Sequence, residues 1–374
     1  MYEKKEILVY PYDIEFCPIL RHSEMMLEYA VAAIVSPLGW GMNGKDAAVA
    51  DGGDCLNINV NSDFESLLPL CDCVLFSEAE RPLDFDKSIL PKVINAVSAG
   101  KDILYLRELD EERKKKLKGI CKKYDVGFKT CDDFKDTFSV DDSYSLKLHK
   151  INTPVIFVTG SYERTQKFEI QLSLRDAFNS LGYNVSQVGS RNYCELIGFH
   201  SFPEFMYKSS IADEKKIFAF NHYLKELEIE ESPDVLIVGI PGGVMRLNDS
   251  FTGRFGIMAY EVSQAVTPDV AVFSTLYEDV QPDYFEKVSM SIKYKLGFDI
   301  SCYNLSNVKF DWDVAKDSEK ESYLLLDSSF IQKRIPKFNM LKTPVFNILN
   351  DRDKGNMASF LIDTLSYFGE VESV

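Results

Sequence analysis

Apolar, β-branched runs alternate with helical patterns along almost the whole chain, and this alternation limits the fold more than any other sequence feature. In the first 140 residues the strand patterns are residues 7–10, 32–36, 73–77 and 102–106. The helical patterns between and after them are residues 23–30, 62–70, 86–99 and 110–124. Parallel strands need a long crossover, usually a helix. The sequence therefore predicts an α/β fold with mainly parallel sheets.

Local end signals support several of these helices. Ser62-x-x-Glu65 is a capping box at the start of the predicted helix 62–70, and Gly100 closes helix 86–99. In helix 110–124 two acidic residues precede the basic run 113–116, which suits the helix dipole and a solvent-exposed face.

The strand and helix pattern restarts after a polar, acidic segment at residues 132–150, which is typical of a linker. We therefore expect two domains, residues 1–148 and residues 149–374. The strands expected in the second domain are residues 153–160, 184–188, 234–240, 270–274, 299–304 and 344–348. The helices expected there are residues 166–181, 213–227, 259–265, 282–296 and 357–368.

Composition excludes several classes of protein. A length of 374 residues is enough for two domains with real cores. The net charge of −16 and a pI of about 4.8 argue against nucleic-acid binding and against docking on an anionic membrane. No apolar run approaches the ~20 residues of a membrane span, and the N-terminus lacks a signal-peptide pattern. We expect a cytoplasmic protein with reduced thiols, since none of its eight cysteines forms a Cys-x-x-Cys pair.

The segment at the end of the predicted strand 153–160 carries the clearest chemical signal. Gly-Ser-Tyr-Glu-Arg-Thr-Gln-Lys, residues 160–167, is a glycine, a polar loop and a lysine at the start of a helix. Loop amides, the helix N-terminus and the lysine together can hold phosphate. The residues expected to bind a cofactor phosphate are Gly160, Ser161, Arg164, Thr165 and Lys167.

This loop departs from the standard pattern in three ways. It is one residue longer, Gln166 replaces the second glycine, and Phe168 replaces the hydroxyl residue that would hold Mg²⁺. Thr165 or Glu169 would have to supply a metal ligand instead. The alternative is an ordinary strand-to-helix turn with an exposed lysine.

A second polar segment, residues 189–203, follows the predicted strand 184–188. Its side chains offer acid–base groups, Glu195 and His200, and an arginine, Arg191, that could hold a carboxylate or phosphate. Cys194 with His200 could also form a nucleophile and base, or half of a metal site, and the alternative is a structural loop. The residues expected to contact substrate are Arg191, Asn192, Tyr193, Gly242, Gly243 and Arg254.

Two further observations bear on metals. The strand that ends at Gly239-Ile240-Pro241 lacks the acidic residue that related loops use to bind a metal. In the first domain, Cys17 with His22, and Cys55 with Cys71 and Cys73, fit no zinc spacing. We therefore predict no metal site in the protein itself; the one metal expected is Mg²⁺ that binds together with a phosphate group.

Residues 155–175, 182–190, 233–243 and 255–269 together resemble a family of P-loop proteins that includes a D-amino-acid N-acetyltransferase. The resemblance implies a Rossmann-like N-terminal domain followed by a P-loop NTPase-like domain of the dethiobiotin-synthetase type. It also implies ATP or acetyl-CoA as the cofactor.

Residues 189–203 and 304–312 resemble, more closely, a protein of clostridial peptide-maturation systems. That resemblance implies a precursor peptide, a carrier-like protein and a radical SAM enzyme as partners, and a homo-oligomer is compatible with it. Two functions are therefore expected. One is acyl or phosphoryl transfer in the maturation of a ribosomally made peptide, with Lys167, Glu195 and His200 in catalysis. The other is a non-catalytic protein that presents a peptide or carrier to the radical SAM partner.

Overall fold

The computed structural model describes residues 4–134, 138 and 147–371, and it divides into two compact units. The first unit contains Met1–Lys135 and Tyr193–Gly198, and the second contains Asp136–Asn192 and Phe199–Val374. Most of the linker expected at residues 132–150 lies outside the described residues. No helix in the described ranges is long and apolar enough to cross a membrane.

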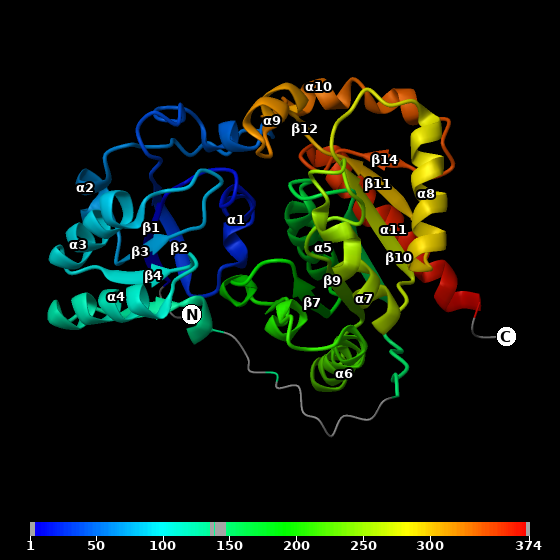
Figure 1. Ribbon diagram of the computed structural model, residues 1–374, viewed down its shortest axis with the longest axis horizontal. Coiled ribbons are helices and arrows are strands. Elements are labelled where there is room, and N and C mark those ends of the chain that lie inside the picture. Colours follow the sequence, from blue (N-terminus) through cyan, green and yellow to red (C-terminus); the bar gives the residue numbers. More distant parts are fainter. Residues whose placement is uncertain (1–3, 135–137, 139–146, 372–374) are drawn as a thin grey trace. The chain divides into compact units, whose positions relative to one another are not determined.

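The first unit is built on a five-stranded parallel sheet with the order β2-β1-β3-β4-β5 (Figure 1). Its strands are β1 (Lys5–Tyr10), β2 (Tyr29–Ile34), β3 (Cys73–Phe76), β4 (Asp102–Tyr105) and β5 (Phe128–Thr130). Its α-helices are α1 (Cys17–Arg21), α2 (Phe64–Leu67), α3 (Leu90–Ser98) and α4 (Glu111–Lys123). Short helical turns are η1 (Ser23–Met25), η2 (Ala47–Ala50), η3 (Leu68–Leu70), η4 (Phe85–Ile89), η5 (Cys131–Asp133) and η6 (Cys194–Ile197).

Two helix predictions in the first unit are wrong in detail. Residues 23–30 form only the short turn η1 before β2 begins at Tyr29. The predicted capping box also fails, because the residue that caps α2 is Asp63, whose carboxylate accepts the Ser66 amide at 3.2 Å. Aspartate is as good a cap as serine, so the pattern alone could not separate these neighbours.

The second unit contains a seven-stranded parallel sheet with the order β14-β11-β10-β6-β9-β7-β8. Its strands are β6 (Val155–Gly160), β7 (Val185–Gly189), β8 (His200–Ser201), β9 (Val235–Gly239), β10 (Val270–Thr275), β11 (Cys302–Leu305) and β14 (Val345–Phe346). Its main helices are α5 (Lys167–Ser180), α6 (Asp213–Glu231), α7 (Ile257–Ala265), α8 (Pro282–Leu296) and α11 (Asp351–Val371). The two sheets confirm the predicted α/β fold with mainly parallel strands.

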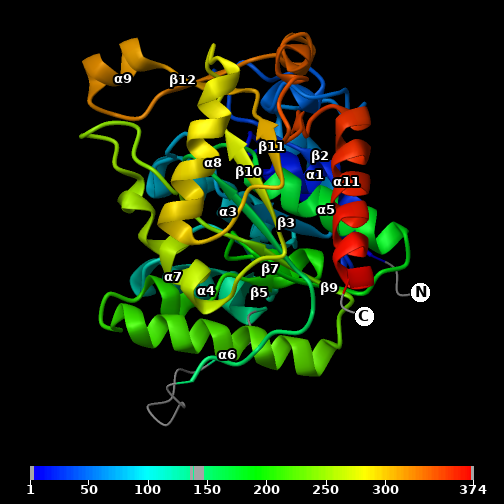
Figure 2. The same ribbon diagram turned by 90° about the vertical axis from the view of Figure 1, so that its right-hand side faces the viewer.

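Side chains of the central strand β6 alternate between the two faces of this sheet. Val155 and Phe157 join the core that α6, α7 and α8 cover, whereas Ile156 and Val158 join the core under α5 and α11. Figure 2 shows α5 and α11 on one side of the sheet and α7 and α8 on the other. Helices on both faces explain why these strands are continuously apolar.

The segment between β11 and β14 forms additional elements that were not predicted from the sequence. It contains a separate two-stranded antiparallel hairpin, β12 (Val308–Phe310) and β13 (Tyr323–Leu325), with α9 (Trp312–Ser318) between the strands. The elements η7 (Glu204–Tyr207), η8 (Gly253–Gly256), α10 (Ser328–Gln332) and η9 (Ile335–Phe338) complete the unit.

Candidate functional site

The carboxyl ends of β6, β9 and β10 meet where the order of the second sheet reverses. From β6 the chain passes to β7 on one side, and it returns across β6 when it runs from β9 to β10. Ligands of open parallel sheets bind at such a reversal, outside the carboxyl ends of the strands. The loop 161–166, between β6 and α5, lies at this position.

Backbone hydrogen bonds fix this loop between its neighbours. The Ser161 amide donates to the Ser274 carbonyl of β10 at 2.8 Å. On the other side, the Val244 amide donates to the Gly160 carbonyl at 3.1 Å. The start of the loop is therefore held on one side by the end of β10 and on the other by the segment that follows β9.

Two glycines are required where these segments approach one another. A Cβ on Gly160 would lie 2.5 Å from the Thr165 hydroxyl and 3.3 Å from Cδ of Lys167. A Cβ on Gly243 would lie 2.6 Å from the backbone Cα of Tyr162. Gly243 therefore acts through close approach, whereas its neighbour Gly242 has open space and serves the turn with a φ of +75°.

Lys167 is the first residue of α5, and its side chain turns back over the loop. The ammonium group donates to the Tyr162 carbonyl at 2.7 Å and to the Thr165 hydroxyl at 3.4 Å. The residue is only 7% exposed, and burial lowers its pKa from 10.5 to about 8. In the described part of the chain no carboxylate lies within 4.0 Å of it, so a buried cation has only neutral partners.

The first turn of α5 lies beside this cation. The first helical hydrogen bond runs from the Ile170 amide to the Gln166 carbonyl at 3.1 Å. The amides before Ile170 in this turn have no acceptor within the helix, as at any helix N-terminus. Together with Lys167 they form a local concentration of positive potential in a protein of net charge −16.

A buried polar network continues from the loop into β10 and β11. The Ser274 hydroxyl donates to the Thr165 carbonyl, and the Asn304 amide group donates to Ser274 Oγ at 2.8 Å. Gln166, in the left-handed region with a φ of 61°, accepts the Asn307 amide at 3.3 Å. The sequence analysis missed these residues because nothing in their local pattern connects positions so far apart.

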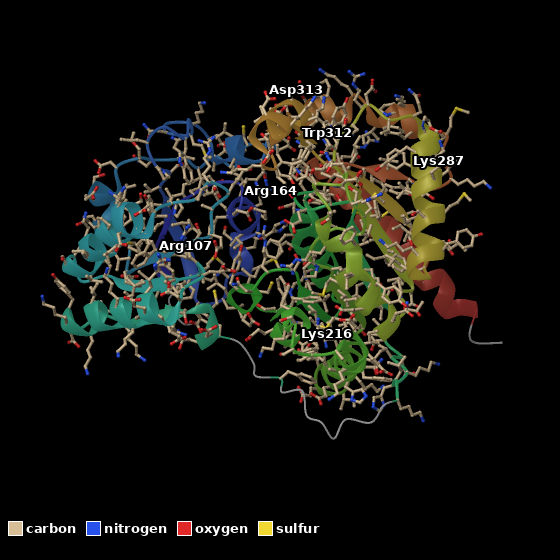
Figure 3. All side chains as sticks on the ribbon, viewed as in Figure 1. Arg107, Arg164, Lys216, Lys287, Trp312 and Asp313 are labelled. Atoms are coloured by element: carbon tan, nitrogen blue, oxygen red, sulfur yellow. The ribbon has the colours of Figure 1, made fainter. Side chains whose placement is uncertain are left out.

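The segment β12–α9–β13 contacts the same loop through Tyr162. The Tyr162 hydroxyl donates to Glu321 at 2.7 Å, and the Tyr323 hydroxyl donates to the other oxygen of Glu321 at 2.8 Å. The ring of Tyr162 packs in a small apolar cluster with Val308 and Phe310. The Arg164 guanidinium lies 5.1 Å from the Tyr323 ring, and Figure 3 marks Arg164 and, on α9, Trp312.

Arg191 reaches the start of α5 from the loop after β7. Its guanidinium carbon lies 5.6 Å from the centre of the Phe168 ring, and its charge contributes to the lowered pKa of Lys167. Gln171 positions the preceding residue: its Nε2 donates to Ser190 Oγ, and its Oε1 accepts the Ser190 amide, both at 3.1 Å. Arg191 thus lies close to the start of α5, and the ligand contact predicted for it stays a prediction.

The other residues predicted in segment 189–203 lie in different surroundings. Asn192 belongs to the second unit, while the following residues Tyr193, Cys194 and Glu195 group with the first unit. Cys194 is fully buried there. In the second unit, the His200 ring forms an ion pair with Glu231 at the end of α6.

Arg254 lies on the exposed side of the turn η8, with a φ of 52°. The shape of this turn is held by Lys295 of α8, which donates to the carbonyls of Val244 at 2.7 Å and Phe255 at 2.9 Å. Lys295 therefore links the predicted Arg254 segment to the residue after Gly243.

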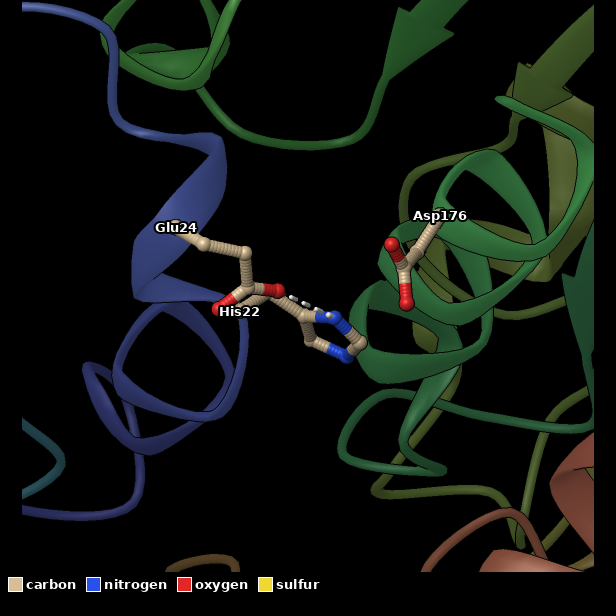
Figure 4. A group of neighbouring side chains, drawn as sticks. All are labelled: His22, Glu24 and Asp176. Carbon is tan, nitrogen blue, oxygen red and sulfur yellow. Dashed lines mark ion pairs between the residues drawn. The ribbon is translucent and has the colours of Figure 1, made fainter. Parts of the chain in front are cut away.

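His22, one member of the pairs that fitted no zinc spacing, is buried in the first unit. Its Nδ1 lies 4.0 Å from a carboxylate oxygen of Glu24, as Figure 4 shows. All eight cysteines are free thiols, and seven of them are buried.

Comparison with known proteins adds one informative match. No family model and no curated protein matches the sequence. A DUF1611 family protein from Anabaena variabilis has a similar solved structure, with a TM-score of 0.63 and 11% identity over 97% of this chain and 100% of that one. At this identity the likeness shows a shared fold across both units and carries nothing about activity.

Two other structures are much less similar. Chloroplast FtsY from Physcomitrella patens has a TM-score of 0.26 and 12% identity, over 65% of this chain and 76% of that one. Homoserine dehydrogenase from S. aureus also has a TM-score of 0.26, with 9% identity over 34% of this chain and 33% of that one. The protein is an α/β protein with a five-stranded and a seven-stranded parallel sheet, and its fold is similar to that of the DUF1611 family structure.

Proposed function

We propose that the loop 161–166 and Lys167 bind the diphosphate group of ATP or of acetyl-CoA, and that the protein uses this cofactor in group transfer. The observation that carries the proposal is the buried ammonium of Lys167, whose partners are a carbonyl and a hydroxyl. A buried charge whose direct partners are all neutral is costly to keep, although the Glu163 carboxylate acts on Lys167 from a greater distance. A bound phosphate would supply a negative charge in direct contact and accept hydrogen bonds from the first turn of α5.

Acyl transfer is the form of the reaction that this loop favours. Phosphoryl transfer depends on a divalent ion that bridges the phosphates, and Phe168 stands where the usual hydroxyl ligand would be. In acyl transfer the diphosphate of CoA only binds the cofactor to the protein and takes no part in the chemical step. The acceptor amine bonds to the acyl carbon and the carbon–sulfur bond of the thioester breaks. A base takes one amine proton and passes it to the departing sulfur, so that CoA leaves as the thiol.

His200 is the base that this proposal assigns, with Glu231 as its partner. A carboxylate beside an imidazole fixes the orientation of the ring, as the partner of a general base does. The acceptor proposed is the precursor peptide of a ribosomally made natural product, because residues 189–203 and 304–312 resemble a protein of such maturation systems.

A second function is favoured by the absence of any acidic residue where β9 ends. Gly239-Ile240-Pro241 offers no carboxylate, and Phe168 offers no hydroxyl. A protein that has lost both groups could keep the fold to present a precursor peptide or a carrier-like protein to a radical SAM enzyme. In that case the loop around Lys167 would bind a ligand but perform no transfer.

Calorimetric titration of the purified protein with ATP, GTP and acetyl-CoA tests the proposal. We expect micromolar binding of one ligand, and loss of that binding in Lys167→Met, which keeps the length of the side chain but not its charge. Lys216→Met is the matched control, since Lys216 is also buried but has Glu261 as a partner at 3.5 Å (Figure 3 labels Lys216). No binding of any of the three ligands, or equal binding by Lys167→Met, would refute the phosphate site.

Transfer is tested separately. The acetyl-CoA complex, mixed with amine-bearing precursor peptide, should release free thiol in the wild type and not in His200→Ala. Thiol release that is unchanged in His200→Ala would remove His200 from the reaction. Binding of ligand with no release of thiol would favour the presenting protein.

A further inference from the structure

Phosphate loops of this shape ordinarily use Mg²⁺, so the residues around Lys167 can be compared with what a magnesium ion needs. Mg²⁺ takes oxygen ligands in octahedral geometry. The usual sources are a hydroxyl on the residue after the lysine and an acidic residue at the end of a nearby strand. In the second unit these two positions are Phe168, the residue after Lys167, and the end of β9.

Neither place offers an oxygen ligand from a side chain. Phe168 is 4% exposed and has no polar atom in its side chain. At the end of β9, the side chain of Gln171 lies directly against Gly239, where an added Cβ would be 2.1 Å from Gln171 Cδ. The Gln171 amide group is in turn paired with Ser190 through two hydrogen bonds. The two substitutes named from the sequence are engaged elsewhere, since the Thr165 hydroxyl donates to the Tyr162 carbonyl at 3.2 Å and Glu169 accepts the Ser173 hydroxyl at 3.1 Å. The two usual positions therefore do not fit a magnesium site.

Gly239, Gln171 and Ser190 together position the guanidinium of Arg191 beside Phe168. Gly239 leaves room for Gln171, Gln171 holds Ser190 from both its backbone and its hydroxyl, and the next residue is Arg191. The Arg191 side chain extends over the Phe168 ring at 5.6 Å, which is within the range of a cation–π contact. An apolar ring at this position therefore supports a cation where a hydroxyl would support a metal.

The charge of Arg191 also reaches Lys167. Burial is the largest cause of the lowered pKa of the lysine, the attraction of Glu163 opposes it, and the repulsion of Arg191 is a smaller contribution that lowers the pKa further. A bound anion close to both cations would reduce the repulsion between them. A guanidinium can hold two phosphate oxygens through parallel hydrogen bonds, and unlike Mg²⁺ it has no shell of tightly bound water to lose.

We propose that Arg191 takes the place of the divalent cation in this site, so that diphosphate binding requires Arg191 and Lys167 and does not require a metal. The inference rests on the proposed phosphate site, and it specifies how that site neutralises its ligand. Gln171 and Gly239 are positioning residues in it, since they act through Ser190 and the backbone that carries Arg191.

Inorganic pyrophosphate is the probe, because ATP and CoA share a diphosphate and pyrophosphate has no base to add contacts. Binding is measured by calorimetry near neutral pH, once with EDTA and once with excess Mg²⁺. The variants are Arg191→Gln, Arg191→Lys, Phe168→Thr and Lys167→Met. Arg334→Gln is the matched control, because Arg334 lies over the Phe330 ring at 5.0 Å but belongs to the α10–η9 region.

In EDTA, the wild type should bind pyrophosphate at least as tightly as in Mg²⁺, since the metal also competes for the probe. Arg191→Gln should weaken binding about tenfold or more, the effect of losing a charge-assisted bidentate contact. The pyrophosphate affinity of Arg191→Lys should lie between those of the wild type and Arg191→Gln, because lysine keeps the charge but cannot form two parallel hydrogen bonds. Arg334→Gln should bind like the wild type, and Phe168→Thr should gain a dependence on Mg²⁺. Thermal unfolding of each variant identifies any that fail to fold.

Failure of this inference and failure of the phosphate site give different results. If Mg²⁺ tightens wild-type binding tenfold, or if Arg191→Gln binds normally while Lys167→Met does not, the phosphate site stands and the role of Arg191 is refuted. If the wild type binds pyrophosphate under neither condition, the phosphate site fails, and the role of Arg191 fails with it.

Discussion

The affinity of the site for a diphosphate should fall steeply as the pH rises through about 8, because Lys167 must be charged to hold the ligand. In the free protein, burial places the pKa of Lys167 at about 8. A bound phosphate stabilises the ammonium and returns its pKa toward the ordinary value of 10.5. Ligand binding is then coupled to uptake of a proton.

The magnitude follows from the charged fraction of Lys167. With a pKa of about 8, about three quarters of the lysine is charged at about pH 7.5 and only about 3% at about pH 9.5. The dissociation constant should therefore rise about 20-fold over this range, which is about 1.8 kcal/mol. ADP is a suitable ligand, since phosphate groups with a pKa of about 6 are already fully ionised across the range.

Calorimetry in buffers of different ionisation enthalpy measures the proton directly. We expect uptake of about 0.2 protons per ADP at about pH 7.5 and about 0.9 at about pH 9.5. Lys167→Met should bind weakly at every pH, with no such trend. A dissociation constant that stays flat across the range, or the same trend in Lys167→Met, would refute the assignment of Lys167 as the titrating phosphate ligand.

The same pKa predicts a cost in stability. Because the folded lysine has a pKa below that of the unfolded chain, the unfolded state binds more protons between about pH 8 and 10.5, and folding stability rises across that window. At neutral pH the buried charge costs up to about 3 kcal/mol, from 1.36 kcal/mol for each pH unit between the two pKa values. Lys167→Met should therefore unfold at higher denaturant concentration than the wild type at neutral pH, with a smaller difference at about pH 10.

Three further predictions concern the surroundings of Lys167. Gly243→Ala should abolish ADP binding and lower the free energy of unfolding, measured by denaturant titration, by about 1–3 kcal/mol, because its Cβ would meet the Tyr162 backbone at 2.6 Å. The control Gly119→Ala, which has open space on α4, should raise the free energy of unfolding by about 0.5–1 kcal/mol in the same titration. Tyr162→Phe should cost about 1 kcal/mol of stability in that assay, because Glu321 loses one of its two hydroxyl donors; no loss would show that the bond is not formed in solution. His200→Ala should leave the calorimetric affinity for ADP within about twofold, as its ring is paired with Glu231; a tenfold loss would place His200 at the phosphate.

Elements with strong local signals could be predicted from the sequence. The helix predicted at residues 282–296 has the bounds of α8, Pro282–Leu296, since proline fits its first turn and Gly297 ends it with a φ of +85°. The loop between β6 and α5 was located for the same reason, because an apolar strand, a glycine and a lysine follow one another directly. Short-range patterns of this kind depend on the backbone within one or two turns.

The rest of the site depends on contacts between distant positions, which one sequence does not show. Nothing in the local pattern pairs Tyr162 with Glu321, or Gln171 with Ser190. The placement of Arg191 over Phe168 requires the packing of α5 against β9, through Gly239. Likewise, the six residues Tyr193–Gly198 group with the first unit, although they follow a strand of the second.

The position of β6 in its sheet has a consequence for synthesis of the chain. β6 is the first strand of the second unit to leave the ribosome, yet its two neighbours are β9 and β10. The nearer of them, β9, is made roughly 80 residues later, which takes about 4 to 16 seconds at ordinary rates of translation. During that interval an apolar strand with both edges open can pair with other chains. The central strand that precedes the loop 161–166 is therefore also a segment at which a slowed or truncated chain can aggregate.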